Sequence, residues 1–264
     1  MKFENLKERM EYFKKLCDYR LTPNSYVLAH IDGRAFSHMV KKKFKLPFDD
    51  TFINMMNETA IYICKNVQGC KIAYTQSDEI SLVITDFDSP NSDSFFGYRL
   101  CKMQSIIASL ATGKFNQMAI ENLVKDCSTT EEIQAVISDF KPLQFDCKVW
   151  TVPTYNDAFA WLLYRQNDCI KNSKQQAAQT YIKHKELNKK VADDQISLLK
   201  EKTGIDWESD YDNGKKYGRL IYKEKNQFNS EKYGNFTRNA FVSHDATPLE
   251  RESFDALNII PIRE

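Results

Sequence analysis

Residues 71–85 read KIAYTQSDEISLVIT, and residues 26–36 read YVLAHIDGRAF. The first stretch carries two runs rich in β-branched and aromatic residues, 71–74 and 80–85, joined by a short polar segment. This pattern predicts a β-hairpin. The second stretch predicts a buried strand that ends at Asp-Gly, because glycine commonly terminates a strand at a turn. These three strands form the centre around which the other elements are placed.

Apolar residues at helical spacing flank these strands. They predict helices over residues 4–20, 48–66 and 95–118, and the composition of residues 146–152 predicts a further strand after a mostly helical connection. The resulting order, β, α, β, β, α, β, matches the split βαβ arrangement of ferredoxin-like domains. We therefore predict an α+β fold with an antiparallel sheet and helices on one face.

The pattern changes after residue 152. It is helical from residue 156 to about 202, with a break predicted near Lys171–Ser173, and then shows short β-like runs at Gly218–Tyr222 and Arg238–Val242. We predict two domains: residues 1–152, the catalytic sheet with its N-terminal helix, and residues 153–264, a helical region with a C-terminal tail.

The 264-residue composition excludes several classes of protein. With 42% hydrophobic residues the chain can build a sizeable core, and a net charge of +1 argues against a purely electrostatic, histone-like binder. The N-terminus is charged and lacks the apolar stretch of a secretory signal. The seven cysteines include no CxxC pair, which is typical of reduced thiols. These features predict an intracellular protein, cytoplasmic or mitochondrial, without a membrane span.

The balanced charge is unevenly distributed along the chain. Residues 34–46 hold five basic side chains and no acid, residues 171–190 hold six lysines and one glutamate, and residues 72–98 hold five acids and no base. Basic segments around an acidic hairpin are what a polyanion bound over a carboxylate site requires. For each lysine run alone, a solvated helix face is the simpler interpretation.

Two carboxylates are candidates for a metal site. Asp32 ends one predicted central strand, and Asp78 lies at the tip of the neighbouring hairpin. In a ferredoxin-like sheet these two points meet, and Mg²⁺ commonly takes one or two carboxylates with waters and phosphates. Gly33 lacks a side chain, so its carbonyl oxygen can approach a metal closely. The alternative role for a single aspartate at a strand end is a turn or a helix cap.

The helix predicted after the acidic loop carries two cations, Arg99 and Lys102, three residues apart and so on one face. This face is a candidate for binding the phosphates of a nucleotide that lies on the metals. The alternative is again a solvated helix face.

Several motifs together resemble the tRNA-histidine guanylyltransferase family of 3′-to-5′ polymerases. They are HIDGRAF at 30–36, KIAYTQSDE at 71–79, Arg99-x-x-Lys102, WLLYRQNDCIKNS at 161–173, KEL at 185–187 and TGIDW at 203–207. The similarity extends from about residue 5 to residue 223, and the first two motifs are specific as a pair. It implies a polymerase-like palm followed by a helical, fingers-like region.

The resemblance also implies site residues and ligands. Asp32, Asp78 and Glu79 would be catalytic, and Asp32, the Gly33 carbonyl and Asp78 would hold two Mg²⁺ ions. ATP and GTP or other nucleoside triphosphates would be substrates. The implied nucleotide-binding residues are Arg34, Ser37, Lys45, Asp49, Ser77, Arg99 and Lys102. The implied RNA-binding residues are Asn172 and Ser173, with Lys183, Lys185, Lys189 and Lys190 on the phosphates of tRNA. The family implies a homotetramer.

One motif distinguishes branches of this family. The guanylyltransferases proper carry His-x-Asn-Asn where this chain has Ile170-Lys-Asn-Ser173. The Asn-Ser version resembles the guanylyltransferase-like branch, which implies repair of tRNA 5′ ends by template-dependent 3′-to-5′ nucleotide addition to an ATP-activated end. The alternatives are addition of the extra 5′ guanosine to tRNA-His and, less favoured, a nucleotide-cyclase-like palm enzyme. A non-catalytic RNA-binding module is disfavoured because the sheet positions are mostly aliphatic.

Overall fold

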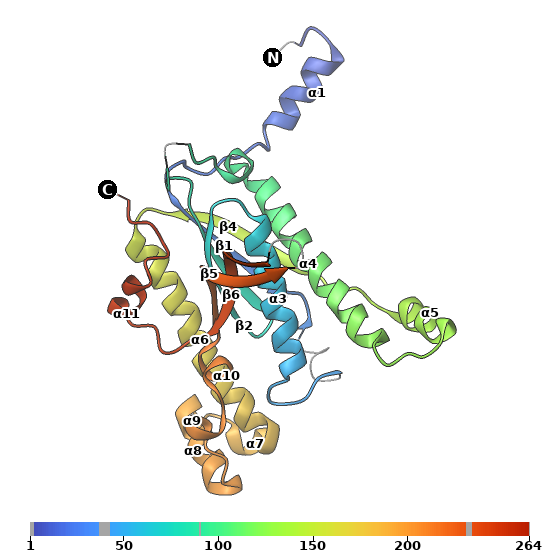
Figure 1. The fold of residues 1–264 in the computed structure, drawn as a ribbon, viewed down its shortest axis with the longest axis vertical. Coiled ribbons are helices and arrows are strands. Elements are labelled where there is room, and N and C mark those ends of the chain that lie inside the picture. Colours follow the sequence, from blue (N-terminus) through green and yellow to red (C-terminus); the bar gives the residue numbers. More distant parts are fainter. Residues whose placement is uncertain (1–2, 37–42, 90, 231–233, 264) are drawn as a thin grey trace.

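The computed structural model describes residues 3–36, 43–89, 91–230 and 234–263 (Figure 1). None of the helices in these ranges combines the length and the apolar composition that crossing a membrane requires.

A six-stranded antiparallel sheet forms the centre of the described chain, in the order β4-β1-β3-β2-β5-β6. The strands are β1 (Tyr26–Gly33), β2 (Cys70–Gln76), β3 (Glu79–Ile84), β4 (Phe145–Val152), β5 (Arg219–Ser230) and β6 (Gly234–Asp245). β1 lies between β3 and β4, and β3 lies between β1 and β2. The predicted ferredoxin-like order is therefore confirmed for the first four strands.

Two long helices cover one face of this sheet: α3 (Asp50–Asn66) and α4 (Leu100–Val124). Their core with the strands includes Ile31, Met56 and Ile107, which are fully buried. This confirms the predicted α+β palm with helices on one face. α4 begins five residues later than predicted, because residues 95–98 form the 3-10 turn η1 with positive φ angles that an α-helix does not accept.

The opposite face of the sheet is covered by α6 (Tyr155–Tyr181). Tyr26 and Leu28 of β1 pack there with Ala158 and Leu162 of the helix. Because β1 is buried on both faces, its apolar run is nearly continuous rather than alternating.

α6 continues through the break that was predicted near Lys171–Ser173, so that prediction is wrong. Its sequence contains no glycine or proline. The Ser173 hydroxyl donates to the carbonyl of Ile170 within the helix and to that of Lys216 outside it. Polar residues alone do not stop a helix whose next turn, at Ala177, packs into a core. The break falls instead after Tyr181.

Four short helices pack at the far end of α6 around Leu199 and Trp207. They are α7 (His184–Leu187), α8 (Ala192–Thr203), α9 (Trp207–Asp210) and α10 (Asn213–Tyr217). The described chain is completed by α1 (Leu6–Lys15), which has no buried residue, by α5 (Thr130–Asp139) and by α11 (Arg251–Ala256).

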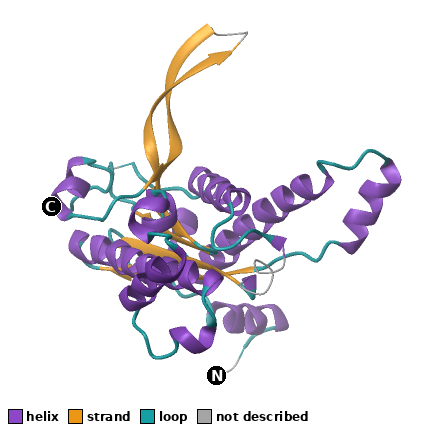
Figure 2. Cartoon of the chain, turned by 90° about the horizontal axis from the view of Figure 1, so that it is seen from below, coloured by secondary structure: helices purple, strands orange, loops and turns teal. Residues whose placement is uncertain are grey.

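The two β-like runs predicted in the tail are confirmed as β5 and β6, and both are longer than predicted. Residues 219–222 of β5 pair with residues 72–75 of β2, and beyond this the β5–β6 hairpin projects from the body (Figure 2). Both strands come from the predicted second domain. The sheet therefore includes residues from both sides of the predicted boundary at residue 152.

Candidate active site

The end of β1 and the β2–β3 turn meet at one end of the central strands of the sheet. Asp32 lies directly opposite Glu79 in the β1–β3 register, and the Gly33 N–H donates to the Asp78 carbonyl oxygen over 3.2 Å. Ser77, at φ 48°, closes the turn, and its hydroxyl donates to the Asp78 carboxylate over 2.9 Å. The topology thus brings Asp32, Gly33 and Asp78 together, as predicted from the strand order.

Glycine is required at position 33 for a steric reason. A Cβ atom there would lie 2.5 Å from the ring of Phe36, which is buried in the core beneath the turn. The chain can therefore turn tightly after Asp32 only without a side chain at the next position.

The two aspartates share an unfavourable electrostatic environment. Burial raises the pKa of Asp78 to about 6, and the charges of Asp32 and Glu79 add to this effect. Burial and the charge of Glu79 also raise the pKa of Asp32. Neither carboxylate has an ion-pair partner within the ranges that the structure describes. Two close acidic groups without a counter-charge are what a bound divalent cation would relieve.

The donor set suits magnesium better than a transition metal. In the described part of the chain there is no group of three or more His, Cys, Asp or Glu residues arranged to hold a metal. Mg²⁺ is usually bound by only one or two carboxylates, its other ligands being water and substrate phosphate. The pair of Asp32 and Asp78, with the Gly33 carbonyl beside them, fits that requirement.

Glu79, predicted to be catalytic, is engaged in a different contact. Its Oε2 atom forms an ion pair with Arg165 of α6 and accepts a hydrogen bond from Gln76 Nε2 over 2.6 Å. Arg165 also pairs with Asp168 over 3.0 Å. The Glu79 carboxylate is thus held by Arg165 of α6, in addition to lying beside the two aspartates.

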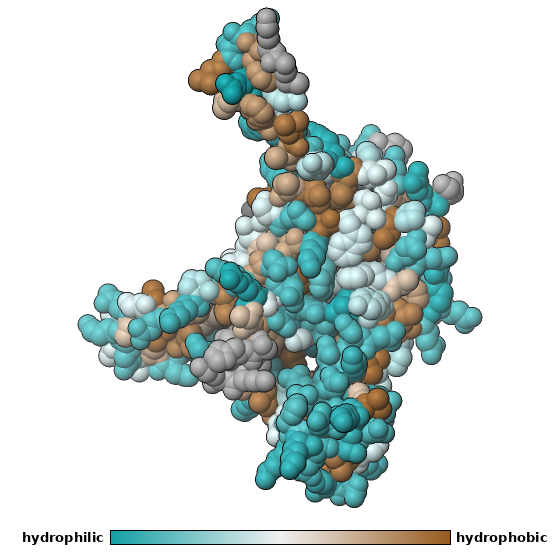
Figure 3. Space-filling view, turned by 180° about the vertical axis from the view of Figure 1, so that it is seen from behind, coloured by the Kyte–Doolittle hydropathy of each residue, from teal (hydrophilic) through white to brown (hydrophobic). Residues whose placement is uncertain are grey.

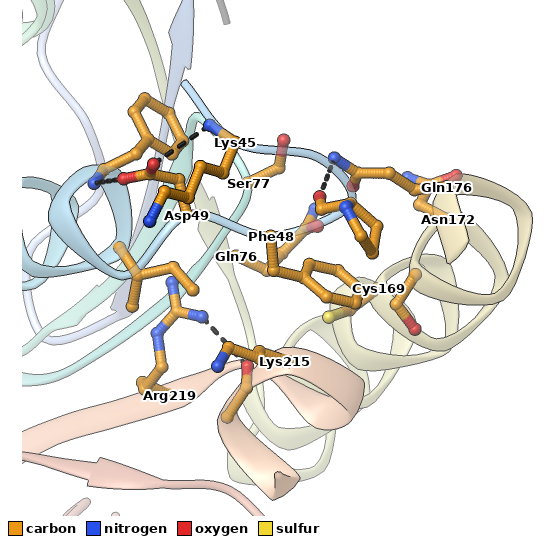
Figure 4. Close-up of a pocket in the computed structure, with 15 residues that line it drawn as sticks. Lys45, Phe48, Asp49, Gln76, Ser77, Cys169, Asn172, Gln176, Lys215 and Arg219 are labelled. Atoms are coloured by element: carbon orange, nitrogen blue, oxygen red, sulfur yellow. Dashed lines mark hydrogen bonds between the residues drawn. The ribbon is translucent and has the colours of Figure 1, made fainter. Parts of the chain in front are cut away.

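A pocket of about 80 Å³ adjoins the β2–β3 turn (Figure 4). It lies between the start of α3, the turn and α6, with Ser77 at its edge. Of the predicted site residues, Lys45, Asp49, Ser77, Asn172 and Ser173 line it. Residues that were not predicted as site residues also line it: Gln76, Cys169, Gln176, Lys215 and Arg219. These five residues come from four different elements, β2, α6, α10 and β5, so no local motif could identify them together.

Arg219 is the most unusual residue of this pocket. Its side chain is buried, its Nε donates to Asn57 Oδ1 over 3.0 Å and its Nη1 donates to the Gly214 carbonyl over 2.9 Å. Its Nη2 has no hydrogen-bond partner among the described residues. Arg219 therefore places a buried positive charge in the wall of the pocket, which favours an anionic ligand.

Asp49 has a structural function in addition to lining the pocket. It is the N-cap of α3: its two carboxylate oxygens accept hydrogen bonds from the backbone N–H groups of Phe52, over 2.9 Å, and of Lys45, over 3.0 Å. This shapes the segment that carries Lys45. Arg34 lies near the site but on the surface, where its guanidinium donates to Gln144 Oε1 over 3.0 Å. Ser37 lies outside the described residues.

Arg99 and Lys102 lie elsewhere, contrary to prediction. Arg99 Nε pairs with Asp18 over 2.7 Å, and Lys102 Nζ lies 4.4 Å from the centroid of the Phe96 ring. Arg99 forms a β-bridge with Arg20, six residues before β1 begins, whereas Asp32 lies where β1 ends. The reason is that β3 runs away from the β2–β3 turn, so the loop after β3 begins at the opposite end of the strands.

The predicted RNA-binding residues divide into two groups. Lys183, Lys185, Lys189 and Lys190 are exposed, within or next to α7. The end of the molecule that α7 to α10 form is largely hydrophilic on the face drawn in Figure 3. Ser173 is buried, and its hydroxyl is bonded to main-chain carbonyls. Ser173 thus joins α6 to the segment before β5, and its contact with RNA stays a prediction.

Comparisons with known proteins are consistent with this geometry. A family model described as tRNAHis guanylyltransferase matches residues 7–153. The uncharacterized protein R259 of Acanthamoeba polyphaga mimivirus is 31% identical over 245 residues, which cover 84% of this chain and 78% of that protein. The tRNA(His) guanylyltransferase of Schizosaccharomyces pombe is 33% identical over 111 residues, and the match spans only 41% of either protein.

A solved structure extends the similarity to nearly the whole chain. A bacterial tRNA(His) guanylyltransferase (Thg1)-like protein in complex with ATP matches with a TM-score of 0.80 and 28% sequence identity. The alignment covers 97% of this chain and 99% of that protein. The similarity thus includes the helices after the palm and the β5–β6 hairpin.

Proposed function

This chain belongs to the tRNA-His guanylyltransferase family of nucleotidyltransferases, and we propose that it adds nucleotides in the 3′-to-5′ direction to the 5′ end of tRNA, copying the opposite strand. In this proposal it repairs truncated 5′ ends. Its homotetrameric assembly and its location in cytoplasm or mitochondrion stay predictions.

The observation that supports this proposal most directly is the unpaired Asp32–Asp78 couple beside a pocket with cationic donors. Asp32, Asp78 and the Gly33 carbonyl would hold two Mg²⁺ ions. Such ions lower the pKa of an attacking hydroxyl and stabilise charge on the phosphates. Lys45, Ser77 and Arg219 would orient the nucleotide from the pocket side, because cations and hydroxyl donors suit phosphate oxygens.

The reaction has two nucleotidyl-transfer steps. The 5′-monophosphate of the RNA attacks the α-phosphorus of ATP, forming an adenylylated 5′ end and releasing pyrophosphate. The 3′-hydroxyl of the incoming nucleotide then attacks the activated 5′ phosphorus, and AMP leaves. The protein contributes mainly position and electrostatic stabilisation, as in other phosphoryl transfers. ATP as activator is supported by the ATP complex of the bacterial relative.

Ile170 favours repair over addition of a non-templated guanosine. It occupies the position where the guanylyltransferases proper have histidine, and it packs partly buried against the hydrophobic cluster of α6 and α8. This chain therefore presents no imidazole there. The alternative, addition of the extra guanosine to tRNA-His, is supported by the named activity of the fission-yeast relative.

A parallel substrate assay tests the proposal. Transfer RNAs lacking one to three 5′ nucleotides, and intact tRNA-His without its extra guanosine, are incubated with ATP and all four nucleoside triphosphates, and the products are sequenced. We expect template-matched additions to the truncated RNAs, and none with Asp32→Asn. Exclusive addition of guanosine to tRNA-His would establish the alternative. Pyrophosphate release from nucleotide alone, without extended RNA, would contradict both.

A further inference from the structure

Arg165 of α6 forms a buried connection to the catalytic turn. Only 8% of its side chain is exposed, and its guanidinium pairs with Glu79, the residue that follows Asp78. It lies against two aromatic rings, at 5.7 Å from the Trp161 centroid and 5.2 Å from that of Tyr164. The arginine thus reaches from the helix to the sheet edge through an enclosed, partly aromatic space.

The position of Glu79 makes this ion pair important for the aspartates. In the β1–β3 register Glu79 lies directly across from Asp32, so the two side chains lie on the same face of the sheet. Asp146 lies opposite Asp32 on its other side, in the β1–β4 register, so without a partner Glu79 would be a further carboxylate at a place that already holds Asp32, Asp78 and Asp146. Arg165 supplies the positive charge that balances it.

The same ion pair also closes the turn. Glu79 Oε2 accepts from Gln76, so the residues on either side of Ser77–Asp78 are joined by their side chains as well as by the strand pairing. Arg165 is in turn held by Asp168 on its own helix, over 3.0 Å. The network therefore connects α6, the turn and the site of Asp78 in one chain of contacts.

Stability alone is a poor reason for such a contact. Removing an arginine and a carboxylate from water is costly, and apolar residues of similar volume often stabilise a fold equally well. Trp161 and Tyr164 already provide apolar surface at this point. A buried ion pair with one end at the candidate active site is therefore better explained by what it does to that site.

We propose that Arg165 is a positioning residue that acts through Glu79: it balances the charge of Glu79 and fixes the turn, so that Glu79 does not compete with Asp32 and Asp78 for the metal ions. The inference rests on the proposed function, since it concerns the same metal site. Arg165 itself does not touch the reacting groups.

A double-mutant cycle tests this role. Arg165→Met leaves the half-buried Glu79 without an ion-pair partner, and we expect the kcat of nucleotide addition to fall about 100-fold, with less than a 3-fold change in KM for the nucleotide. Glu79→Gln alone should lower kcat less than 10-fold. Combining the two should restore at least 10-fold relative to Arg165→Met. If the double variant is as slow as Arg165→Met, the inference is wrong.

Magnesium binding provides a readout that needs no RNA. An unpaired Glu79 adds a further carboxylate beside Asp32 and Asp78, so calorimetric titration of Arg165→Met with Mg²⁺ should show a midpoint at least 3-fold lower than wild type, and Glu79→Gln in that background should reverse the shift. An unchanged midpoint would contradict the inference. A wild-type protein that extends no RNA would refute only the proposed function, since this shift would still be observed.

The chain offers a matched control. Arg251 of α11 pairs with Asp255 over 2.7 Å and lies 4.5 Å from the Tyr155 centroid and 5.3 Å from that of Phe159, so it makes a similar contact at the other end of α6, although 40% of its side chain is exposed. Arg251→Met should leave kcat and the Mg²⁺ midpoint within 2-fold of wild type. If Arg165→Met does not fold, Arg165→Gln, which also removes the charge but keeps a polar side chain, serves instead. Equal losses in Arg251→Met and the Arg165 variant would indicate a purely structural role and overturn the proposal.

Discussion

The two ends of the central sheet carry charge in opposite ways. At the end formed by the β2–β3 turn, Asp32 and Asp78 are partly buried and have no ion-pair partner in the described chain. At the other end, Arg99 and Asp18 pair on the surface, and this hydrogen bond lowers the pKa of Asp18. Charges that satisfy each other are typical of a structural contact. Charges held without partners mark the end where a ligand has to bind.

The largest expected effect comes from removing the charge of Asp78, at the end of the sheet where the aspartates have no ion-pair partner. Asp78→Asn should reduce the rate of nucleotide addition about 1,000-fold, because metal ions contribute several kcal/mol to such transfers. The same change should raise the free energy of unfolding in Mg²⁺-free buffer by roughly 1–3 kcal/mol, since it removes a buried, repelled charge. Single-turnover kinetics and chemical denaturation measure the two effects. Near wild-type activity in Asp78→Asn would remove the metal assignment.

A substitution in the pocket beside Asp78 should have an intermediate effect on nucleotide binding. Lys45→Ala removes a cation that lines it, and we expect KM for the nucleotide to rise about 10-fold, in line with the loss of one charge-assisted hydrogen bond. Affinity for tRNA should stay within 2-fold, as measured by filter binding. A larger loss of tRNA affinity than of nucleotide affinity would show that this pocket holds RNA instead.

Lowering the pH protonates Asp78 and so removes its charge gradually, whereas the Asp78→Asn substitution removes it completely. Because its pKa is raised to about 6, the folded protein binds this proton more tightly than the unfolded chain does. The contribution of Asp78 to stability is therefore highest at low pH and decreases as pH rises from about 4 to about 6. Activity should change in the opposite direction, falling about 10-fold per pH unit below 6.

Melting temperatures recorded from pH 4 to pH 8, with and without Mg²⁺, check this dependence. Asp78→Asn serves as the control, because it lacks this titrating group and should show a smaller decrease between pH 4 and pH 6, with the raised pKa of Asp32 contributing the remainder. A wild-type curve that matches the Asn variant over this interval would contradict the assignment of the raised pKa to Asp78.

The smallest effect is expected at the paired end. Arg99→Ala should raise the pKa of Asp18 toward its ordinary value, because the hydrogen bond from Arg99 is the main cause of its lowered value. Titration of Asp18 by NMR measures the shift, and Lys14→Ala, which changes a neighbouring cation of the same pocket, is the comparison. If the pKa of Asp18 is the same in wild type and in Arg99→Ala, the ion pair at this end of the sheet does not stabilise the Asp18 charge, and the contrast between the two ends fails.

Much of the fold follows from local patterns. The apolar runs and the turn residues between 26 and 85 specify two adjacent features, a strand that ends at Asp32-Gly33 and a hairpin with Asp78 at its tip. The order of elements then places these features at one edge. This is why the carboxylate pair could be predicted, since it depends only on strand order and on which residues end each strand.

The contacts between distant segments were decided by tertiary packing alone. Arg165 meets Glu79 across 86 residues because α6 covers the sheet, and Arg219 enters the pocket because β5 pairs with β2. Arg99, in contrast, lies at the opposite end of the strands because the loop after β3 starts there. Sequence periodicity reports which side of an element is apolar, but burial of one element against another sets which charged groups meet. The amino-acid pattern alone therefore specified the two aspartates, whereas the residues that surround and balance them emerged only when the chain packed.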